Sequence, residues 1–260
     1  MTLDETMPEF ESTGYRLHYE WGAPFDPRRP TLVLLHDGLG AIGSWRELPA
    51  RLAAELRANT LVYDRWGYGR SEARPAFEDR FMEREVPILL ELLEHLGIER
   101  PCLVGHSDGG SIALLFAAWH PGRVQAVVTE AAHTFVEPET QAGIRALVAL
   151  QAAGRTPAWL YKLHEGRADD VLRTWSDHWL SDVHARWDIR GELPGVRCPV
   201  LAVQGDADEF GTQAQVDSIL AAIAGAQSWI APSCGHTPHS QAEDAFVKQV
   251  RDFLRPYLYD

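Results

Sequence analysis

Three side chains of this sequence, Ser107, Asp208 and His236, are of the types that nucleophilic catalysis requires. A serine hydroxyl is a weak nucleophile at neutral pH, so a neighbouring base must take its proton as the oxygen attacks a substrate. Histidine suits this task because its ordinary pKa is close to neutral and it can return the proton to the leaving group. A carboxylate must hold the imidazole in one tautomer and stabilise its charged form. Together the three residues predict acyl transfer through a covalent intermediate on Ser107.

Ser107 stands in the middle of Gly105-His106-Ser107-Asp108-Gly109, with a glycine two residues away on either side. The apolar run Cys102-Leu103-Val104 before it is typical of a buried strand, and apolar residues recur at helical spacing after it, namely Ile112, Leu115, Phe116 and Trp119. A residue on so sharp a strand-to-helix turn has strained backbone geometry, and only small neighbours let the chain pack around it. The N–H groups and positive dipole end of the next helix would stabilise negative charge on the attacked oxygen.

This strand, turn and helix resemble the nucleophile elbow of the α/β-hydrolase family, and the resemblance covers most of the chain. The run from Asp64 to Ser71, with the pattern D-x-x-G-x-G-x-S, is similar to the turn after the corresponding strand in that family. Its polar residues are expected to be structural, with Asp64 and Arg65 pairing to hold the loop. The order serine, acid, histidine along the chain also matches the family.

The resemblance further implies which acid and which histidine are used. In the family the acid usually stands three residues after the glycine that ends its strand, and this count from Gly205 leads to Asp208. Asp206 is the alternative, although such an aspartate is more often a turn residue that accepts backbone N–H groups. The pair Gly235-His236 matches a Gly-His pair of the family, whereas His239 is expected to pack at the start of the last helix.

Two backbone N–H groups are expected to hold the oxyanion, the negatively charged oxygen of the attacked carbonyl. One belongs to Asp108, which follows the serine. In the resembled family the other commonly comes from the residue two past a histidine that ends an early strand, which here is Gly38, with Asp37 and Leu39 as alternatives. His36 itself is expected to shape the loop. The side chains of Asp37 and Asp108 predict a site that disfavours a second negative charge near the scissile bond.

Strand-like and helix-like patterns alternate along the chain, which predicts an α/β fold with a mostly parallel, doubly wound sheet of about eight strands flanked by helices. The continuous apolar run Thr31–Leu35 is typical of a strand buried on both faces of a parallel sheet. A hairpin is expected between Glu9 and Trp21. Further strands are expected at 60–63, 102–104, 124–128, 198–205 and 227–230, and helices at 81–96, 213–224 and 242–254.

No strand pattern is evident between residues 133 and 190, where four of the nine tryptophans gather. Apolar residues at helical spacing, such as Val171, Leu172, Trp175 and Trp179, indicate several helices. An insertion at this point resembles the helical cap of many family members, which covers the serine and selects the substrate. We therefore expect a core formed by residues 1–132 and 191–260, and a cap formed by residues 133–190.

Five residues are candidates for substrate binding, although most aromatic residues of the cap are expected to pack against the core. Trp45 lies soon after the loop that contains the oxyanion donor, and Trp66 is either a core residue or a pocket wall. His133 follows a strand on the side where ligands bind to open parallel sheets. Trp175 and Trp179 are the candidates from the cap.

Composition narrows the range of partners. The net charge of −13 argues against nucleic acid and anionic membrane surfaces, because both require a positive footprint. No apolar run approaches the roughly 20 residues of a membrane span. The first residues, Met1 to Thr6, are acidic and lack the features of a secretion signal, which predicts a cytoplasmic protein. The sequence leaves open whether the protein is a monomer or a homodimer.

Neither the cysteines nor the histidines predict a metal site or a cofactor. Cys102, Cys198 and Cys234 are odd in number and widely spaced, which is typical of reduced thiols rather than disulfides or metal ligands. The histidines near the expected cap, namely His133, His164, His178 and His184, include no pair four residues apart and no nearby cysteine.

The residues and the resemblance together predict a cofactor-free serine hydrolase that cleaves a small carboxylic ester or lactone. The family uses the same three residue types to hydrolyse carbon–carbon bonds and in cofactor-free peroxidase and lyase reactions, and these remain alternatives. A further alternative is a receptor that binds and slowly cleaves its ligand. An aspartate nucleophile is disfavoured, because position 107 is serine.

Overall fold

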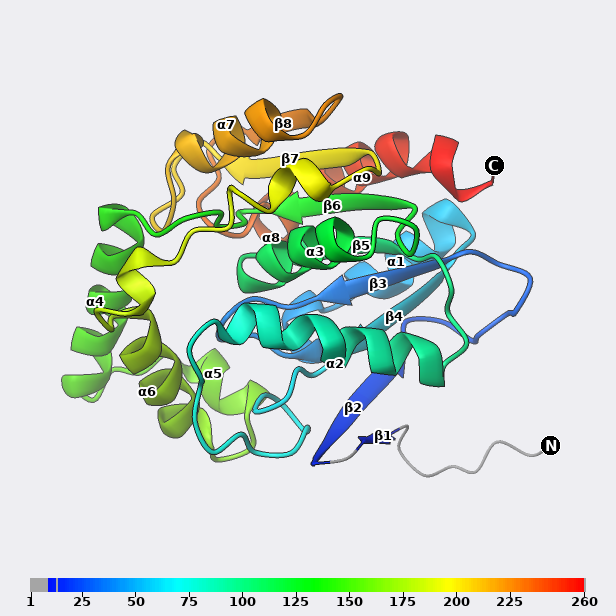
Figure 1. Cartoon of the computed structure of the whole chain (residues 1–260). Helices are drawn as coiled ribbons and strands as arrows, with labels where there is room; N and C mark the ends of the chain where they lie inside the picture. The colour runs from blue at the N-terminus through cyan, green and yellow to red at the C-terminus, as the bar shows by residue number, and fades with distance from the viewer. Residues whose placement is uncertain (1–8, 13, 260) are drawn as a thin grey trace.

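One eight-stranded sheet organises the protein in the computed structural model, which describes residues 9–12 and 14–259 (Figure 1). The strand order is β1-β2-β4-β3-β5-β6-β7-β8, with β1, β2 and β4 paired antiparallel and all later pairs parallel. The strands are β1 Glu9–Ser12, β2 Tyr15–Trp21, β3 Thr31–Leu35, β4 Asn59–Tyr63, β5 Cys102–His106, β6 Ala126–Glu130, β7 Val200–Gly205 and β8 Gln227–Ala231. The predicted fold class is confirmed, including the amino-terminal hairpin, although Thr13 of its turn lies outside the described residues.

Helices cover both faces of the sheet. The α-helices are α1 Leu48–Leu56, α2 Phe81–His95, α3 Asp108–Trp119, α4 Pro138–Ala152, α5 Ala158–Leu163, α6 Ala168–Trp179, α7 Gln213–Ala222, α8 Pro238–Gln241 and α9 Glu243–Leu258. Three short 3₁₀ helices are η1 Ile42–Trp45, η2 His184–Arg186 and η3 Leu193–Gly195. Strands and helices therefore alternate along the chain, as the sequence analysis predicted for a doubly wound sheet.

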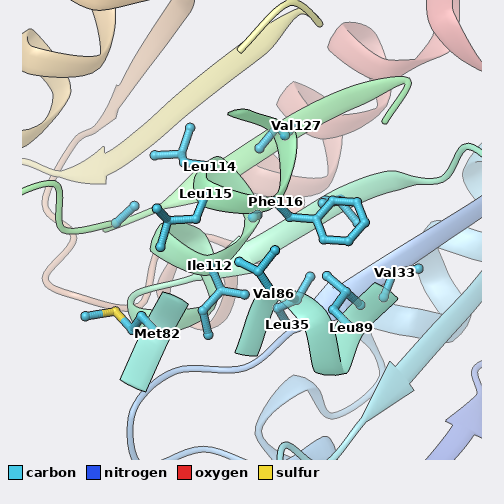
Figure 2. Packing of buried hydrophobic residues seen from close by; sticks show 14 of the residues in the cluster. Val33, Leu35, Met82, Val86, Leu89, Ile112, Leu114, Leu115, Phe116 and Val127 are labelled. Atoms are coloured by element: carbon cyan, nitrogen blue, oxygen red, sulfur yellow. The ribbon is translucent and has the colours of Figure 1, made fainter. Parts of the chain in front are cut away.

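Two buried apolar layers hold the helices to the sheet, because successive strand residues point to opposite faces. Val33 and Leu35 of β3 pack on the side of α2, α3 and α7, whereas Leu32 and Leu34 pack on the side of α1 and α9. Figure 2 shows the first layer, in which side chains of α2 and α3 meet those of β3 and β6. Every residue of β5 is buried, so the strand that leads to Ser107 is fixed on both faces.

The predicted ends of several elements differ from the observed ones for simple reasons. Strand β7 begins at Val200 rather than Cys198, since Pro199 lacks an N–H group for the ladder. Helix α2 stops as predicted near Gly97, whose φ of +67° is a left-handed conformation that glycine adopts easily. The short helix α8 lies partly in what the sequence analysis treated as loop, and α9 continues to Leu258, four residues beyond its expected end at Leu254.

Between β6 and β7 the chain forms α4, α5 and α6, which lie beyond the carboxyl ends of the parallel strands (Figure 1). The expected helical character of residues 133–190 is confirmed, and an isolated bridge between Phe135 and Asp188 joins the two ends of the segment. In the described part of the chain, no helix combines the length and the apolar character needed to cross a bilayer.

Candidate active site

The backbone of Ser107 is held in a rare conformation, with φ of 51° and ψ of −119° at the junction of β5 and α3. A side chain on Gly105 would collide with the backbone of Gly109, and one on Gly109 would collide with the backbone of Leu35. These contacts explain why the sharp turn requires glycine at both positions. Such strain costs about 1–3 kcal/mol and persists only where the surrounding structure enforces it. The fixed strand β5 and the helix α3 supply that constraint, and Ser107 lines a large cavity.

The imidazole of His236 is oriented by a buried carboxylate. Its Nδ1 atom lies 2.8 Å from Oδ1 of Asp208, whose side chain is fully buried. Burial by itself raises the pKa of Asp208, but the hydrogen bond and the charge of His236 and the N–H of Phe210 outweigh burial and lower the pKa. Asp206, the alternative acid, is exposed. The geometry therefore favours Asp208 as the partner of the histidine.

Ser107 and His236 line the same cavity, but among the described residues no hydrogen bond joins their side chains. Asp208 and His236 are thus hydrogen-bonded to each other, and Ser107 lines the cavity that His236 also lines. Catalytic hydrogen bonds are often long without a substrate and tighten when one binds. Since Nδ1 of His236 is engaged by Asp208, Nε2 is the nitrogen that can receive a proton from Ser107.

The two expected oxyanion donors, the N–H groups of Gly38 and Asp108, have no acceptor among the described residues. The alternative donor Leu39 is engaged, because its N–H lies 3.3 Å from Oδ2 of Asp37. A side chain on Gly38 would collide with the indole nitrogen of Trp175 and approach Oδ2 of Asp108 to 2.9 Å. Glycine is therefore required at position 38 by the close approach of α6 and α3.

The cavity has a volume of about 640 Å³. Its floor is built by loops at the carboxyl ends of the strands, and α4, α5 and α6 contribute the opposite wall. The lining side chains from these three helices are mainly apolar or aromatic: Ile144, Leu147, Trp159, Leu163, Trp175 and Trp179. A site of this size and lining is typical of a small organic ligand.

Three of the five predicted substrate-binding residues, His133, Trp175 and Trp179, line the cavity. Burial is the main reason that the pKa of His133 falls to about 4, so its ring is neutral at pH 7, and its Nε2 lies 3.1 Å from the carbonyl oxygen of Phe210. A neutral imidazole beside an apolar wall suits a neutral part of a substrate.

The other two candidates, Trp45 and Trp66, do not line this cavity. Trp45 is buried, with its ring centroid 5.0 Å from that of His239. Trp66 lies under the guanidinium of Arg74, at 4.6 Å, and beside the ring of Tyr15. Packing thus places Trp45 in the core and leaves Trp66 half-buried against it.

The expected pairing of Asp64 with Arg65 is wrong. Asp64 instead accepts the backbone N–H groups of Ile42 and Arg70 at 2.7 and 2.8 Å. Arg65 points the other way, and its Nη2 lies 3.6 Å from Oδ2 of Asp108. The carboxylate of Asp108 is fully buried and does not line the cavity, so only Asp37 supports the expectation that the site repels a second negative charge.

A buried group of charges behind the serine was missed by the sequence analysis. Nδ1 of His239 lies 2.8 Å from Oε2 of Glu130, and Nε2 of His106 lies 2.8 Å from the carbonyl oxygen of His236. Burial lowers the pKa of His106, but Glu130 and Asp37 outweigh it and raise the pKa to about 9. These residues come from distant parts of the chain, so no local pattern indicates their contact.

The same residues also bring together atoms of the types that bind metals. Ligand atoms of His106, Glu130 and His239 lie within 4.8 Å of one another. However, both oxygens of Glu130 already accept hydrogen bonds from His239, one from its backbone N–H at 2.6 Å and one from its ring at 2.8 Å. His239 thus engages both oxygens of Glu130.

Comparison with known proteins agrees with this architecture. Residues 30–190 match the family model described as the alpha/beta hydrolase fold, and the chain belongs to this family. The serine hydrolase BPHL of Homo sapiens is 28% identical over 255 residues, which cover 93% of this chain and 84% of that protein. The 2-hydroxy-6-oxo-6-phenylhexa-2,4-dienoate hydrolase of Burkholderia cepacia is 25% identical over 251 residues, which cover 86% of this chain and 87% of that protein.

Among solved structures, the enol-lactonase from Burkholderia xenovorans LB400 superposes with a TM-score of 0.74 and 26% identity. The alignment covers 95% of this chain and 99% of the lactonase. The names of the Burkholderia cepacia hydrolase and of the lactonase state different substrates. The comparisons therefore support hydrolase activity for this chain.

Proposed function

We propose that this protein is a serine hydrolase that cleaves a small carboxylic ester or lactone through an acyl-enzyme on Ser107. The observation that carries the proposal is the meeting of the Asp208–His236 pair and the strained serine in one cavity. Among the described residues the N–H groups of Gly38 and Asp108 have no acceptor, and Gly38 lines the same cavity as Ser107. The similarity to an enol-lactonase supports an ester-type bond as the substrate.

In the proposed reaction, Oγ of Ser107 attacks the substrate carbonyl while Nε2 of His236 takes its proton. The electron pair of the carbonyl moves onto oxygen, and the N–H groups of Gly38 and Asp108 hold that oxyanion. Asp208 stabilises the imidazolium that forms. The imidazolium then donates the proton to the leaving alkoxide, which departs as the alcohol or, in a lactone, stays attached as the freed hydroxyl. Water, activated by the same histidine, releases the acid and restores the serine.

The proposal includes a division of the chain into a core of residues 1–132 and 191–260 and a cap of residues 133–190. The apolar wall that α4, α5 and α6 contribute to the cavity supports this division. In this role Trp175 and Trp179 of the cap, together with His133 at its boundary, would contact the small-molecule substrate.

The experiment combines activity-based labelling with kinetics. The protein and its Ser107→Ala variant are treated with alkyl fluorophosphonates of graded chain length, and the labelled residue is identified by peptide mass mapping. Hydrolysis of p-nitrophenyl esters is measured in parallel. We expect labelling of Ser107 and a fall in kcat of roughly 10⁴–10⁶-fold in Ser107→Ala, leaving only binding and oxyanion stabilisation.

Ser228→Ala is the matched control, because Ser228 is exposed on β8 and does not line the cavity. Retained turnover in Ser107→Ala would exclude the mechanism. Lactones and a diketone-type acid are assayed on the same preparations, and their products are identified directly because neither substrate releases p-nitrophenol. The substrate that is hydrolysed identifies the kind of bond that the protein cleaves.

A further inference from the structure

Arg65 is a fully buried cation that contacts both loops of the proposed oxyanion site. It lies two residues after the end of β4, and no part of its side chain is exposed. Its Nη2 donates a hydrogen bond to the carbonyl oxygen of Asp37 at 2.7 Å and lies 3.6 Å from Oδ2 of Asp108. The reaction scheme above gives Arg65 no role, so the reason for burying a guanidinium here is open.

The first contact acts on the peptide that carries one oxyanion donor. The carbonyl of Asp37 and the N–H of Gly38 are two ends of one peptide unit, so a hydrogen bond to the oxygen polarises the N–H. His36 adds a second bond to this oxygen: its Nε2 accepts the N–H of Arg65 at 3.0 Å, so its Nδ1 carries the ring proton and donates at 2.8 Å. Two donors, one of them charged, thus fix and polarise the Asp37–Gly38 peptide.

The second contact offsets a charge that would oppose catalysis. A methyl group on Gly38 would lie 2.9 Å from Oδ2 of Asp108, so this carboxylate lies beside the residue that carries one oxyanion donor, although it does not line the cavity. Burial raises the pKa of Asp108 to about 6, which leaves it mostly ionised at neutral pH. A negative charge so near an oxyanion raises its energy. The positive charge of Arg65 offsets this negative charge, and the indole N–H of Trp175 donates a hydrogen bond to the carboxylate at 3.2 Å.

Stability alone does not account for Arg65. Among the described residues, its Nε and Nη1 atoms and Oδ1 of Asp108 have no hydrogen-bond partner. Buried charges with incomplete partners lose more by desolvation than they gain, and apolar residues of similar volume are often at least as stable. The contact of the guanidinium with the ring of Tyr68, at 4.5 Å, offsets only part of this cost.

We propose that Arg65 is a positioning residue of the active site, which orients and polarises the Asp37–Gly38 peptide and neutralises Asp108 so that both loops can receive an oxyanion. The inference rests on the proposed function. Arg65 touches no substrate in this arrangement and acts only through the two donors. Its removal therefore weakens binding of the transition state and leaves binding of the neutral substrate unchanged.

The test compares a ligand that forms an oxyanion with one that does not. 2,2,2-Trifluoroacetophenone accepts Oγ of Ser107 at its carbonyl carbon, and the carbonyl oxygen becomes an oxyanion as the serine proton passes to His236. Acetophenone has the same ring and remains a ketone. Both are measured as inhibitors of p-nitrophenyl acetate hydrolysis by the parent, Arg65→Met and Arg65→Lys.

We expect Arg65→Met to lower kcat/KM by about 10²-fold, close to the effect of losing one oxyanion donor. The affinity for the trifluoroketone falls by the same factor, whereas the affinity for acetophenone changes less than threefold. Arg65→Lys keeps the charge but not the forked pair of donors. Its kcat/KM and its affinity for the trifluoroketone should lie between those of the parent and those of Arg65→Met. A folded Arg65→Met that keeps kcat/KM within threefold, or that loses affinity for both ketones equally, overturns the inference.

The double variant Arg65→Met/Asp108→Asn separates the two contacts. It removes both buried charges, so it remains foldable if Arg65→Met alone does not. We expect it to recover part of the loss in trifluoroketone affinity but to stay below the parent, because the Asp37 carbonyl still lacks its charged donor. Affinity equal to that of the parent overturns the role of Arg65 on the peptide.

Measurements on the parent protein distinguish a failure of this inference from a failure of the proposed function. Ser107-dependent ester hydrolysis and trifluoroketone inhibition in the parent, combined with unaffected Arg65 variants, overturn the inference alone. Absence of both activities in the parent overturns the proposed function, and with it the role assigned to Arg65.

Discussion

Oδ1 of Asp208 lies 2.8 Å from Nδ1 of His236 and 2.9 Å from the backbone nitrogen of Phe210. The carboxylate is thus held by its own loop while it orients the imidazole. Asp208→Asn offers an amide that no longer enforces the same tautomer, so we expect kcat to fall by roughly 10³–10⁴-fold with the fold retained. Steady-state kinetics and circular dichroism check both parts.

The control for this variant is Asp206→Asn, which changes an exposed aspartate on the same turn. The backbone N–H of Asp206 donates a hydrogen bond to the carbonyl oxygen of Ala231, and the substitution leaves this contact in place. A loss of kcat in Asp206→Asn comparable with that in Asp208→Asn would contradict the assignment of the acid.

Gly38→Ala tests the loop that carries one proposed oxyanion donor. The new methyl group meets the indole of Trp175 and lies 2.9 Å from Asp108, so the loop or α6 must move. We expect about a 10²-fold loss of kcat, as for removal of one oxyanion donor. A loss of roughly 1–3 kcal/mol in the free energy of unfolding is expected from overpacking.

Gly122→Ala is the matched control, since a methyl group there meets no atom within 4 Å. Kinetics and urea unfolding of the two variants are compared side by side. If Gly38→Ala behaved like Gly122→Ala, the tight contact between loop and helix would not be the reason for glycine at position 38.

The raised pKa of His106 predicts that stability depends on pH. Its pKa is about 9 in the folded protein, held up by Glu130 and Asp37 against burial, and near 6.5 in the unfolded chain. The stabilisation is fully present below pH 6.5 and is lost as the pH rises through 9. We expect the free energy of unfolding to decrease by about 3 kcal/mol across this window.

Urea unfolding at several pH values between 6 and 10 measures this change in the parent and in His106→Gln. The glutamine variant keeps a hydrogen-bonding side chain but cannot bind the proton. Its free energy of unfolding should therefore depend less steeply on pH. The difference in slope corresponds to at most one bound proton. Parallel curves for the two proteins would show that His106 is not charged in the folded state.

Leu147→Trp tests whether the wall contributed by α4 limits the substrate. Leu147 lines the cavity of about 640 Å³, so a larger ring removes space from its apolar part. We expect kcat/KM for p-nitrophenyl octanoate to fall at least about tenfold, while that for the acetate changes little. Ala146→Trp places the same ring on an exposed position of α4 and should leave both rates unchanged.

The sequence was most informative where neighbours along the chain decide the geometry. The elbow at Ser107 follows from an apolar strand, two glycines and a helix within a dozen residues, and the structure shows each of these elements. The choice of Asp208 over Asp206 came from the family's spacing after Gly205, and in the structure Asp208 is the aspartate that contacts His236. In these places the backbone can take only one path, so residue types and spacing are sufficient.

The sequence was misleading where a side chain could point to either side. Asp64 and Arg65 are adjacent just after the end of β4, but their side chains bond to different partners: Asp64 accepts the N–H of Ile42, whereas Arg65 donates to the carbonyl oxygen of Asp37. Trp45 and Trp66 are large apolar rings that packing could place in the cavity wall or in the core. Only their distant neighbours, the ring of His239 and the guanidinium of Arg74, decide the outcome.

By itself the sequence determined the α/β class, the strained serine and the three residue types of the proposed reaction. The tertiary structure decided which groups surround them: the cavity wall from α4 to α6, the pair of Glu130 with His239, and the contact of Arg65 with Asp108. Local backbone geometry is set by residues a few positions apart, because sterics and hydrogen bonds act over that range. Contacts between residues tens of positions apart exist only after the layers of the fold have packed.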